Sequence, residues 1–500
     1  MDQEEGVQEL TPFPVAPQSS PLSVSFRDPA GRLFCLDGRI FRLINERGVA
    51  DLAAFLGSKT GQRFISEGSV ARTHSLDEVQ RRELWARPAV QGIFDNGSSQ
   101  MIVEHERIPF PSYPYEWAPE MLHAAGLLTL DLAEQLLAES IGLKDGTPYN
   151  VLFRGAQPVF IDLLSFERRE GGDPTWLPEA QFTRTFLLPL LANKCFGLSL
   201  DQILVARRDG LEPEEVYRWA GPLQRLKPPF LSLVSLPVWL SARHNPDQTR
   251  IYERRILADA EKARFILTVL LKRLRRTLNR VAPAPRKSVW SDYMESNNNY
   301  TQEHFQAKER FVQQTLEEFP AKRVLDVGCN TGHFSALAAR RGASVVAIDY
   351  DPVVVGNVWR NARREKLDIL PLVVDLTRPS PGTGWCNREC PPFLARATGA
   401  FDLVLMLAVL HHMVVTERVP LAEILSLAAT LTTNLLVIEF VGPEDSMFKR
   451  LVRGREELHR DLTPAVFETA CQEHFEIVRS QHMEGTSRWL YLLRKSPKIT

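Results

Sequence analysis

Residues 326–332, DVGCNTG, combine an acid with a glycine-rich turn, a pattern that binds ligands in many α/β proteins. An apolar run at 324–327 predicts a buried strand before the turn. Helix-forming residues at 334–340 and a second apolar run at 344–348 predict a helix and another strand after it. A strand, turn, helix and strand in this order place a ligand at the carboxyl ends of the strands, beside the N-terminus of the helix.

The spacing of the glycines excludes one common class of ligand. A dinucleotide-binding turn needs the pattern G-x-G-x-x-G. Counted from Gly328, that pattern requires glycine at two positions where this chain has Asn330 and His333. The turn is therefore not predicted to bind NAD. An ordinary strand-to-helix turn with incidental acids is the alternative to a binding site.

Two more acids follow predicted strands. Asp349 comes directly after the strand at 344–348, about 20 residues after Asp326, which is the separation at which an acid reaches ribose hydroxyls in such units. Asp375 follows a third predicted strand, at 370–374. Because the carboxyl ends of parallel strands share one edge of a sheet, we expect Asp326, Asp349 and Asp375 to lie around one cleft.

The pattern D-x-G-x-N-x-G resembles motif I of the class I S-adenosylmethionine methyltransferases. The resemblance implies that Asp326 lies near the methionine part of this cofactor and that the glycine turn passes beneath it. It also implies that Asp375 binds the adenine amino group and that the backbone amide of Leu376 binds a ring nitrogen. The predicted cofactor is thus S-adenosylmethionine. The predicted cofactor-binding residues are Asp326, Gly328, Asn330, Gly332, Asp349, Asp375 and Leu376.

Candidate catalytic groups follow the next two predicted strands. His411 and His412 come after an apolar strand at 401–410, and a histidine at this edge can take a proton from a nucleophilic hydroxyl near neutral pH. Glu439 lies at the end of a strand at 435–440, where a carboxylate can bind substrate or act as a base. The alternatives are a hydrogen-bonded structural histidine and an ion pair between Glu439 and a loop arginine.

The C-terminal part is predicted to be an α/β domain at 290–500, with the Rossmann-like fold that the methyltransferase resemblance implies. Two closing strands, at 475–480 and 488–494, are joined by a turn at Gly485. They fit the seven-stranded mixed sheet of this class, which ends with an antiparallel edge strand. Plain dinucleotide-binding folds do not end in this way.

The N-terminal part is predicted to be an α+β domain at 23–280. Its residues Asp145, Asn150 and Asp162 have the spacing of the catalytic and metal loops of kinase-like phosphotransferases, which this part resembles. Asn and Asp oxygens suit a hard cation such as Mg²⁺. However, no His-Arg precedes Asp145, and no clear Gly-rich phosphate loop is present. An active kinase, a pseudokinase-like or substrate-positioning domain, and unrelated structural polar groups all stay open.

The composition is ordinary for a globular protein, with 44% hydrophobic and 24% charged residues. The formal net charge of −1 gives no sign of bulk nucleic-acid binding, and no apolar run is long enough to predict a membrane span. A Pro-rich lead at 1–22 is predicted to be disordered, and 281–289 to be a linker. The basic stretch 261–280 is predicted to be a solvated helix face, with peripheral membrane contact as the alternative.

The six cysteines lie far apart and form no disulfide framework, which favours the reducing cytoplasm. Cys386 and Cys390 have the spacing C-x3-C, but no second pair of ligands accompanies them. No metal site is therefore predicted.

Stretches in both halves resemble a group of bacterial methyltransferases related to nodulation host-specificity proteins; they are FRDP at 26–29, YPYEW at 113–117, DLLSFE at 162–167 and WCNRE at 385–389. This resemblance implies a glycan or glycolipid precursor as the methyl acceptor. The sequence thus predicts an enzyme that transfers a methyl group from S-adenosylmethionine to an oxygen or nitrogen of an acceptor it does not identify. A bifunctional protein with a Mg/ATP-binding domain and a non-catalytic S-adenosylmethionine-binding protein are the alternatives.

Overall fold

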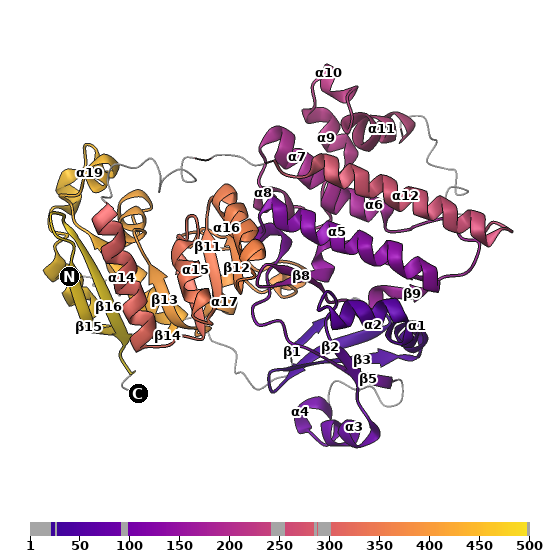
Figure 1. Cartoon of the computed structure of the whole chain (residues 1–500), viewed down its shortest axis with the longest axis horizontal. Helices are drawn as coiled ribbons and strands as arrows, with labels where there is room; N and C mark the ends of the chain where they lie inside the picture. Colours follow the sequence, from indigo (N-terminus) through magenta and orange to yellow (C-terminus); the bar gives the residue numbers. More distant parts are fainter. Residues whose placement is uncertain are drawn as a thin grey trace, which may run out of the picture. The chain divides into compact units, whose positions relative to one another are not determined.

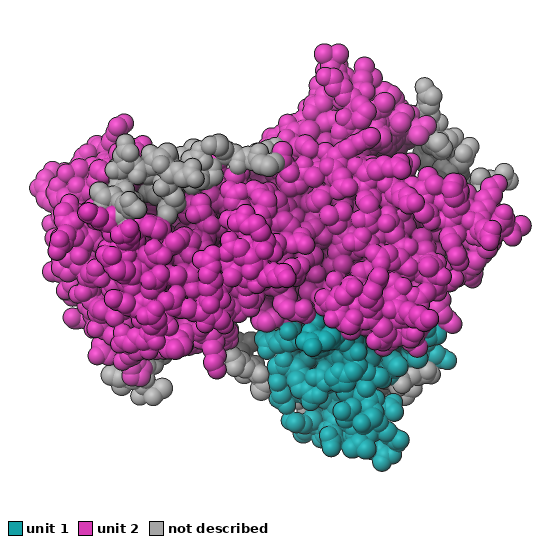
Figure 2. Space-filling model, in the orientation of Figure 1, with its two compact units in different colours: residues 1–50, 72–107 teal, residues 51–71, 108–500 magenta. Residues whose placement is uncertain are grey.

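The computed structural model describes residues 22–25, 28–91, 99–241, 256–284, 288 and 302–497. By its internal contacts the chain divides into two compact units (Figure 2). Unit 1 consists of residues 1–50 and 72–107, and unit 2 consists of residues 51–71 and 108–500. Most of the predicted lead at 1–22 and part of the predicted linker at 281–289 lie outside the described residues. The domain limits proposed from the sequence therefore stay predictions.

Unit 1 contains an antiparallel five-stranded sheet in the order β1-β2-β3-β5-β4. Asp37 and Gly38 join β2 to β3 and both have positive φ, as a two-residue hairpin requires. The strands are β1 Leu22–Ser25, β2 Gly31–Leu36, β3 Arg39–Asn45, β4 Thr73–Ser75 and β5 Ser99–His105.

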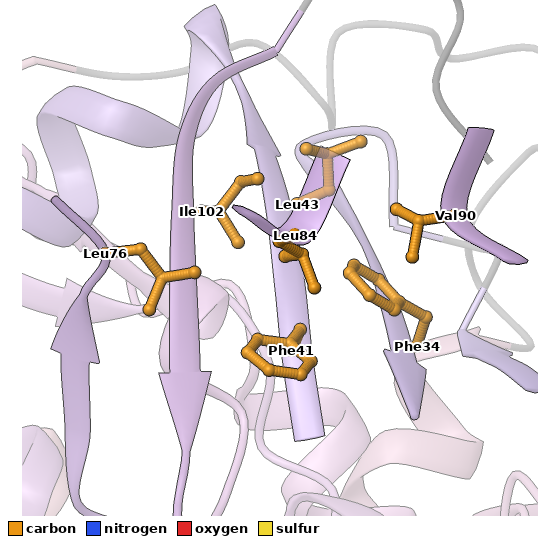
Figure 3. Close-up of a cluster of buried hydrophobic side chains, with 7 residues drawn as sticks. All are labelled: Phe34, Phe41, Leu43, Leu76, Leu84, Val90 and Ile102. Atoms are coloured by element: carbon orange, nitrogen blue, oxygen red, sulfur yellow. The ribbon is translucent and has the colours of Figure 1, made fainter. Parts of the chain in front are cut away.

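Apolar side chains from this sheet pack against the short helices α3, Glu78–Trp85, and α4, Pro88–Gln91 (Figure 3). Burial of these side chains is the main force that holds the sheet and the helices together. The cluster consists of Phe34, Phe41, Leu43, Leu76, Leu84, Val90 and Ile102.

The first part of unit 2 is mostly helical. Its central helix, α5, Pro119–Leu136, packs against the basic amphipathic helix α12, Ala260–Val281. Arg275 of α12 donates hydrogen bonds to Asp131 at 2.7 Å and to Glu134 at 3.0 Å on α5. Helix α1, Glu46–Gly57, begins in unit 1 and continues into unit 2. The other helices and strands of this part include α2 Lys59–Ser66, β6 Ile141–Leu143, β7 Val151–Arg154, β8 Gln157–Phe160, β9 Phe166–Arg168, α6 Glu179–Phe182, α7 Leu188–Phe196, α8 Leu200–Leu204, α9 Pro213–Trp219, α10 Pro222–Arg225 and α11 Leu236–Ser241.

The second part of unit 2 is a seven-stranded mixed sheet in the order β12-β11-β10-β13-β14-β16-β15. Strands β10 to β14 are parallel, and β16 is antiparallel to both of its neighbours. The predicted mixed sheet is confirmed. Strand β15 lies at the outer edge, and the turn at Gly485 leads from it into β16, the antiparallel strand between β14 and β15. The strands are β10 Arg323–Val327, β11 Ser344–Asp349, β12 Ile369–Val373, β13 Phe401–Met406, β14 Thr432–Val441, β15 Phe475–His482 and β16 Arg488–Lys495.

Helices flank this sheet (Figure 1). The chain runs from β10 outward through β11 to β12, and then returns to the other side of β10 for β13 and β14. The order therefore reverses between β10 and β13, and a ligand of such a sheet binds in the crevice at their carboxyl ends. The helices are α14 Gln302–Glu318, α15 His333–Arg340, α16 Pro352–Glu365, α17 Phe393–Ala397, α18 Leu421–Leu431, α19 Ser446–Val452 and α20 Pro464–Cys471.

Buried contacts connect the helical part of unit 2 with its sheet part. Trp359 of α16 donates a hydrogen bond from Nε1 to the Ala156 carbonyl at 3.0 Å. Arg396 of α17 pairs with Glu116, whose side chain is fully buried. None of the helices that the structure describes combines the length and apolar composition of a membrane-spanning segment.

Candidate functional site

The turn after β10 has positive φ values, a backbone conformation that most residues adopt only at a steric cost. Gly328, Asn330 and Gly332 have φ values of +68°, +46° and +80°. Glycine adopts this left-handed region without a steric cost, and asparagine tolerates it better than most residues. The N–H groups of Gly328 and Cys329 both donate to the Ile348 carbonyl of β11, at 2.8 and 3.0 Å. The predicted turn is therefore present, and it is tied to the neighbouring strand.

The turn also lies against the segment that follows β13. A Cβ added to Gly328 would lie 2.5 Å from Cγ2 of Val409, a separation that would force something to move. Ala408, beside Val409, has a φ of +56°. Left-handed backbone at a residue other than glycine is uncommon and often marks a functional site. The glycine turn and the segment that follows β13 thus lie close to each other at the crevice between β10 and β13.

Asp326 lies at the end of β10 and is 2% exposed. Ser335 of α15 donates a hydrogen bond to its Oδ2 at 2.5 Å. Burial raises the pKa of Asp326 to about 6, and the negative charge of Asp349 adds to the rise, while the Ser335 hydroxyl opposes it. The carboxyl therefore fixes the start of the helix to the strand.

Both carboxylate oxygens of Asp349 accept hydrogen bonds from backbone N–H groups. Its Oδ2 accepts the backbone N–H of Asn330 at 3.0 Å, and its Oδ1 accepts the N–H of Asp351 at 3.0 Å. Burial raises the pKa of Asp349 to about 6, although these backbone hydrogen bonds oppose the rise. A carboxylate has about four lone-pair positions, so each oxygen can accept a further hydrogen bond from a ligand.

Asp375 lies just after β12. Thr377 donates to its Oδ1 from both N–H, at 2.9 Å, and Oγ1, at 2.6 Å, and Arg378 donates to Oδ2 at 3.1 Å. Burial acts to raise the pKa of Asp375, but the hydrogen bonds from Thr377 and Arg378 outweigh it, and the pKa is lowered. Asp375 is thus ionised at neutral pH. Leu376, beside it, is buried.

The three predicted acids therefore lie at or just after the carboxyl ends of the neighbouring strands β10, β11 and β12, at one edge of the sheet. The turn between them carries a buried polar atom that lacks a hydrogen bond. Oδ1 of Asn330 has no partner among the residues that the structure describes. An unpaired buried acceptor costs free energy unless a ligand or water donates to it. These hydrogen-bond acceptors fit a ligand with hydroxyl and ammonium donors. Which residue binds which group of the ligand stays a prediction.

His411 and His412 follow β13, and His412 begins a π-helical turn, η9, His412–Thr416. The two rings lie 4.2 Å apart. His411 is 2% exposed, and neither ring nitrogen has a hydrogen-bond partner in the described part of the chain. Burial, followed by the nearby His412 ring and Arg488, lowers the pKa of His411 to about 3, and burial also lowers that of His412. Both rings are therefore neutral at pH 7 and can accept a proton.

Glu439 of β14 lies in a buried ion cluster. Its side chain is fully buried and contacts Nζ of Lys308 on α14 at 2.6 Å and Nη1 of Arg488 on β16 at 3.1 Å. Arg488 also donates to both oxygens of Asp445, at 2.8 and 3.0 Å. The ion pair was one of the readings that the sequence left open, although the partner arginine lies on a strand. A direct role of Glu439 in catalysis stays a prediction.

Sequence reasoning missed Lys308, Ser335 and Arg488. Each lies in a different element from its acidic partner, and nothing in the local pattern of α14, α15 or β16 marks it. A buried charge in a helix or strand reveals its partner only once the tertiary fold is known. Of the three, only Ser335 had a usable signal, because it lies in the first turn of the helix that follows the glycine turn.

In the helical part, the structure brings together the three residues with kinase-like spacing. Asn150 donates a hydrogen bond to Oγ of Ser165 at 2.9 Å, and this hydroxyl donates to Asp162 at 3.0 Å. Asp145 lies 3.5 Å from the same hydroxyl. No group of three or more His, Cys, Asp or Glu side chains within the described ranges is arranged to hold a metal ion.

Residues 299–482 match the model of a methyltransferase domain family. Over 96% of its length the chain is 28% identical to nodulation protein NoeA of Rhizobium meliloti strain 1021, and the match covers 97% of that protein.

Solved structures with related folds include two that cover about two fifths of the chain. One is the N-methyltransferase NodS from Bradyrhizobium japonicum WM9 in complex with S-adenosyl-l-homocysteine, with 14% identity over 42% of this chain and 100% of that one, and a TM-score of 0.30. The other is the bifunctional kinase-methyltransferase WbdD, with 19% identity over 44% of this chain and 45% of that one, and a TM-score of 0.29.

The family match confirms the predicted methyltransferase domain and, with it, the predicted cofactor S-adenosylmethionine. The kinase-like character of the N-terminal part is not confirmed. The C-terminal part of this chain is a Rossmann-like class I methyltransferase domain, in a protein that resembles nodulation-type proteins over nearly its whole length.

Proposed function

We propose that this protein is an enzyme that transfers a methyl group from S-adenosylmethionine to an oxygen or nitrogen atom of an acceptor. One observation supports this more than any other. Asp326, Asp349 and Asp375 follow three neighbouring parallel strands, beside the left-handed turn where Oδ1 of Asn330 lacks a partner. An acid at each strand end and an unused acceptor in the turn suit a nucleoside that carries an amino-acid tail.

When bound, S-adenosylmethionine supplies a methyl group that its sulfonium makes electrophilic. In the proposal, Asp349 accepts hydrogen bonds from the ribose hydroxyls, and Asp375 with the amide of Leu376 binds the adenine. Asp326 holds α15 in place through Ser335, and the turn from Gly328 through Asn330 to Gly332 passes beneath the amino-acid tail. These groups fix the cofactor, so that transfer requires chiefly alignment and exclusion of water.

The acceptor is proposed to bind beside His411 and His412. Because both imidazoles are neutral, either can take the proton that the acceptor loses, although the strongly lowered pKa of His411 makes it the weaker base. Glu439 is held by Lys308 and Arg488, so within the proposal it orients the cationic groups around the site.

The rest of the chain is proposed to bind or orient the acceptor. The similarity to a nodulation protein extends through both parts of the chain. This supports the proposal that the N-terminal part has the same role in both proteins. A glycan or glycolipid precursor is proposed as the acceptor, on the resemblance to nodulation host-specificity proteins. We propose the cytoplasm as the compartment, because the wide spacing of the six cysteines in the sequence is not that of a disulfide framework.

Calorimetry of the full chain with S-adenosyl-homocysteine tests the cofactor site. We expect binding, and Asp349→Ala should weaken it by about tenfold or more, since a charge-assisted hydrogen bond is lost. Asp201→Ala, at an exposed position of α8, is the matched control. Absence of binding, or equal binding by the Asp349 variant, would overturn the assignment. A search of cell extract for a product labelled from methyl-labelled S-adenosylmethionine then separates an enzyme from a non-catalytic binding protein.

A second candidate is a bifunctional protein whose N-terminal part binds Mg²⁺ and ATP. The observation that favours it is the meeting of Asp145, Asn150 and Asp162 at the Ser165 hydroxyl. Asn and Asp oxygens of this kind are the ligands that Mg²⁺ takes beside phosphates. A thermal shift with ATP that requires Mg²⁺ and is lost in Asp162→Ala would support this candidate. No shift at saturating ATP would remove it.

A further inference from the structure

An open cavity of about 320 Å³ lies between two segments that follow strands of the methyltransferase sheet. This volume is at the lower end of the range of about 300–1,000 Å³ that small-molecule sites occupy. Its walls come from η9, from the loop before α18, and from α19 with the turn after it. The lining residues include Val414, Val415, Arg418, Leu451, Val452 and Arg455.

The cavity lies at the carboxyl edge of the sheet. Val414 and Val415 belong to the same π-helical turn as His412, which follows β13. Leu451 and Val452 belong to α19, which follows β14 and begins after Asp445 of the buried ion cluster. Strand β13 pairs with β10, and β14 pairs with β13. The cavity therefore lies on the acceptor side of the crevice rather than beside the acids of β11 and β12.

The floor and the rim of the cavity differ in chemistry. Val414, Val415 and Val452 are buried and form an apolar floor. Arg418 and Arg455 are exposed at the rim, and within the described part of the chain no carboxylate pairs with either guanidinium.

The nearest acids in the sequence are already engaged elsewhere. Glu417 lies 3.5 Å from Arg378, and Glu456 accepts a hydrogen bond from the backbone N–H of Gly454 at 3.0 Å. Arg418 also has a φ of +57°, a conformation that a side chain other than glycine adopts only when its surroundings impose it. An apolar floor with two uncompensated cations at its rim complements a molecule that has an apolar body and an anionic group.

We propose that this cavity binds the methyl acceptor and that the acceptor is an amphipathic anion. Its apolar part lies on Val414, Val415 and Val452, and its anionic group binds Arg418 and Arg455. The inference deepens the proposed function and rests on it, because it places the acceptor in a cavity whose lining includes the π-helical turn that His412 begins.

Three small probes test the inference by calorimetry on the full chain in the presence of S-adenosyl-homocysteine. Octyl phosphate carries both features, octyl glucoside carries only the apolar chain, and inorganic phosphate carries only the charge. We expect octyl phosphate to bind about tenfold or more tightly than either of the others. Arg418→Gln and Arg455→Gln should each weaken octyl phosphate by about tenfold and leave octyl glucoside unchanged.

Arg450→Gln is the matched control, since Arg450 is an exposed arginine of α19 that does not line the cavity. Equal binding of octyl phosphate and octyl glucoside, or equal losses in the Arg418, Arg455 and Arg450 variants, would overturn the inference. Binding of S-adenosyl-homocysteine in the same samples separates the two proposals. If it binds and octyl phosphate does not, only the inference about the cavity fails; if it does not bind, the proposed function fails.

Discussion

At the scale of single residues, the buried carboxyls of Asp326 and Asp349 are expected to make the proposed cofactor site sensitive to pH. Both have a pKa raised to about 6, mainly by burial, against a value near 3.9 in an unfolded chain. The folded protein therefore holds more protons between these values, and ionising the two carboxyls costs folding free energy above pH 6. That cost disappears as the pH falls toward 4.

The same shift predicts how the affinity for S-adenosyl-homocysteine changes with pH. In the proposed function, ionised Asp349 accepts hydrogen bonds from ribose hydroxyls, and protonation removes part of its capacity to accept them. We expect the affinity to fall below about pH 6, by up to about tenfold per pH unit for each proton that binding expels. Calorimetry from about pH 8 to about pH 5 measures this. Asp349→Asn should flatten the profile, and a profile that is already flat in the unchanged protein contradicts the prediction.

His411 supplies a second prediction about a residue. Its two ring nitrogens are buried without partners in the described part of the chain, which costs about 1–3 kcal/mol for an unsatisfied polar group. Replacing it with an apolar side chain removes that cost. We expect His411→Leu to leave the free energy of unfolding unchanged or to raise it by up to about 2 kcal/mol while lowering methyl transfer. Urea denaturation measures the stability, and a loss above about 1 kcal/mol would mean that the ring nitrogens stabilise the fold.

At the scale of elements, the glycine turn can be tested against another glycine of similar conformation. Gly328 and Gly342 both have positive φ, but only Gly328 would bring a new Cβ within 2.5 Å of Val409. Gly342→Ala should therefore lower the free energy of unfolding by about 1–2 kcal/mol, which is the cost of left-handed backbone at a residue that has a Cβ. Gly328→Ala should cost more and should also weaken binding of S-adenosyl-homocysteine. Equal losses of stability in the two variants, measured by urea denaturation, would show that the contact with Val409 has no effect.

The ion cluster around Glu439 joins α14, β14 and β16. Removing the central carboxylate leaves the buried Lys308 without its ion pair to Glu439, and breaking a buried pair in this way costs about 3–5 kcal/mol. We expect Glu439→Gln to lower the free energy of unfolding by an amount in this range. Glu444→Gln breaks an exposed pair with Lys449 and should cost less than about 1 kcal/mol. Similar small effects in both variants would contradict a structural role for the cluster.

The elements show what the sequence could reveal and what it could not. The turn at Gly328, the strand ends at Asp349 and Asp375 and the hairpin at Gly485 were predictable, because each depends on the pattern of a few neighbouring residues. The partners of Glu439 and the cavity between η9 and α19 were not, since they depend on residues far apart in the chain that only the folded sheet brings together. Local patterns thus predicted the glycine turn and the strand ends, but not the contacts between distant elements.

At the scale of the whole molecule, the helical and sheet parts of unit 2 share buried contacts. Phe110, in the chain before α5, lies with its ring 5.9 Å from that of Phe393 and 5.8 Å from that of Phe401. Trp359 reaches the turn between β7 and β8 through its indole nitrogen. Such contacts make the two parts of unit 2 depend on each other for stability, which accords with a site to which both parts contribute.

Arg396 and Glu116 provide the test of that dependence. The Glu116 side chain is fully buried and that of Arg396 is 6% exposed, and Arg396 also donates to the Pro111 carbonyl at 2.6 Å. Arg396→Gln leaves a buried carboxylate without its cation, at a cost of about 3–5 kcal/mol. The double variant with Glu116→Gln should recover part of this loss, since a buried charge is then no longer left unpaired.

Unfolding followed by circular dichroism and by tryptophan fluorescence should show one shared transition for unit 2, shifted to lower urea by Arg396→Gln. Arg364→Gln, which breaks an exposed contact with Glu365, should leave the transition within about 1 kcal/mol of the unchanged protein. If the Arg396 variant instead separates the transition into two, the helical and sheet parts fold independently of each other. The acceptor would then have to be recognised by the methyltransferase domain alone.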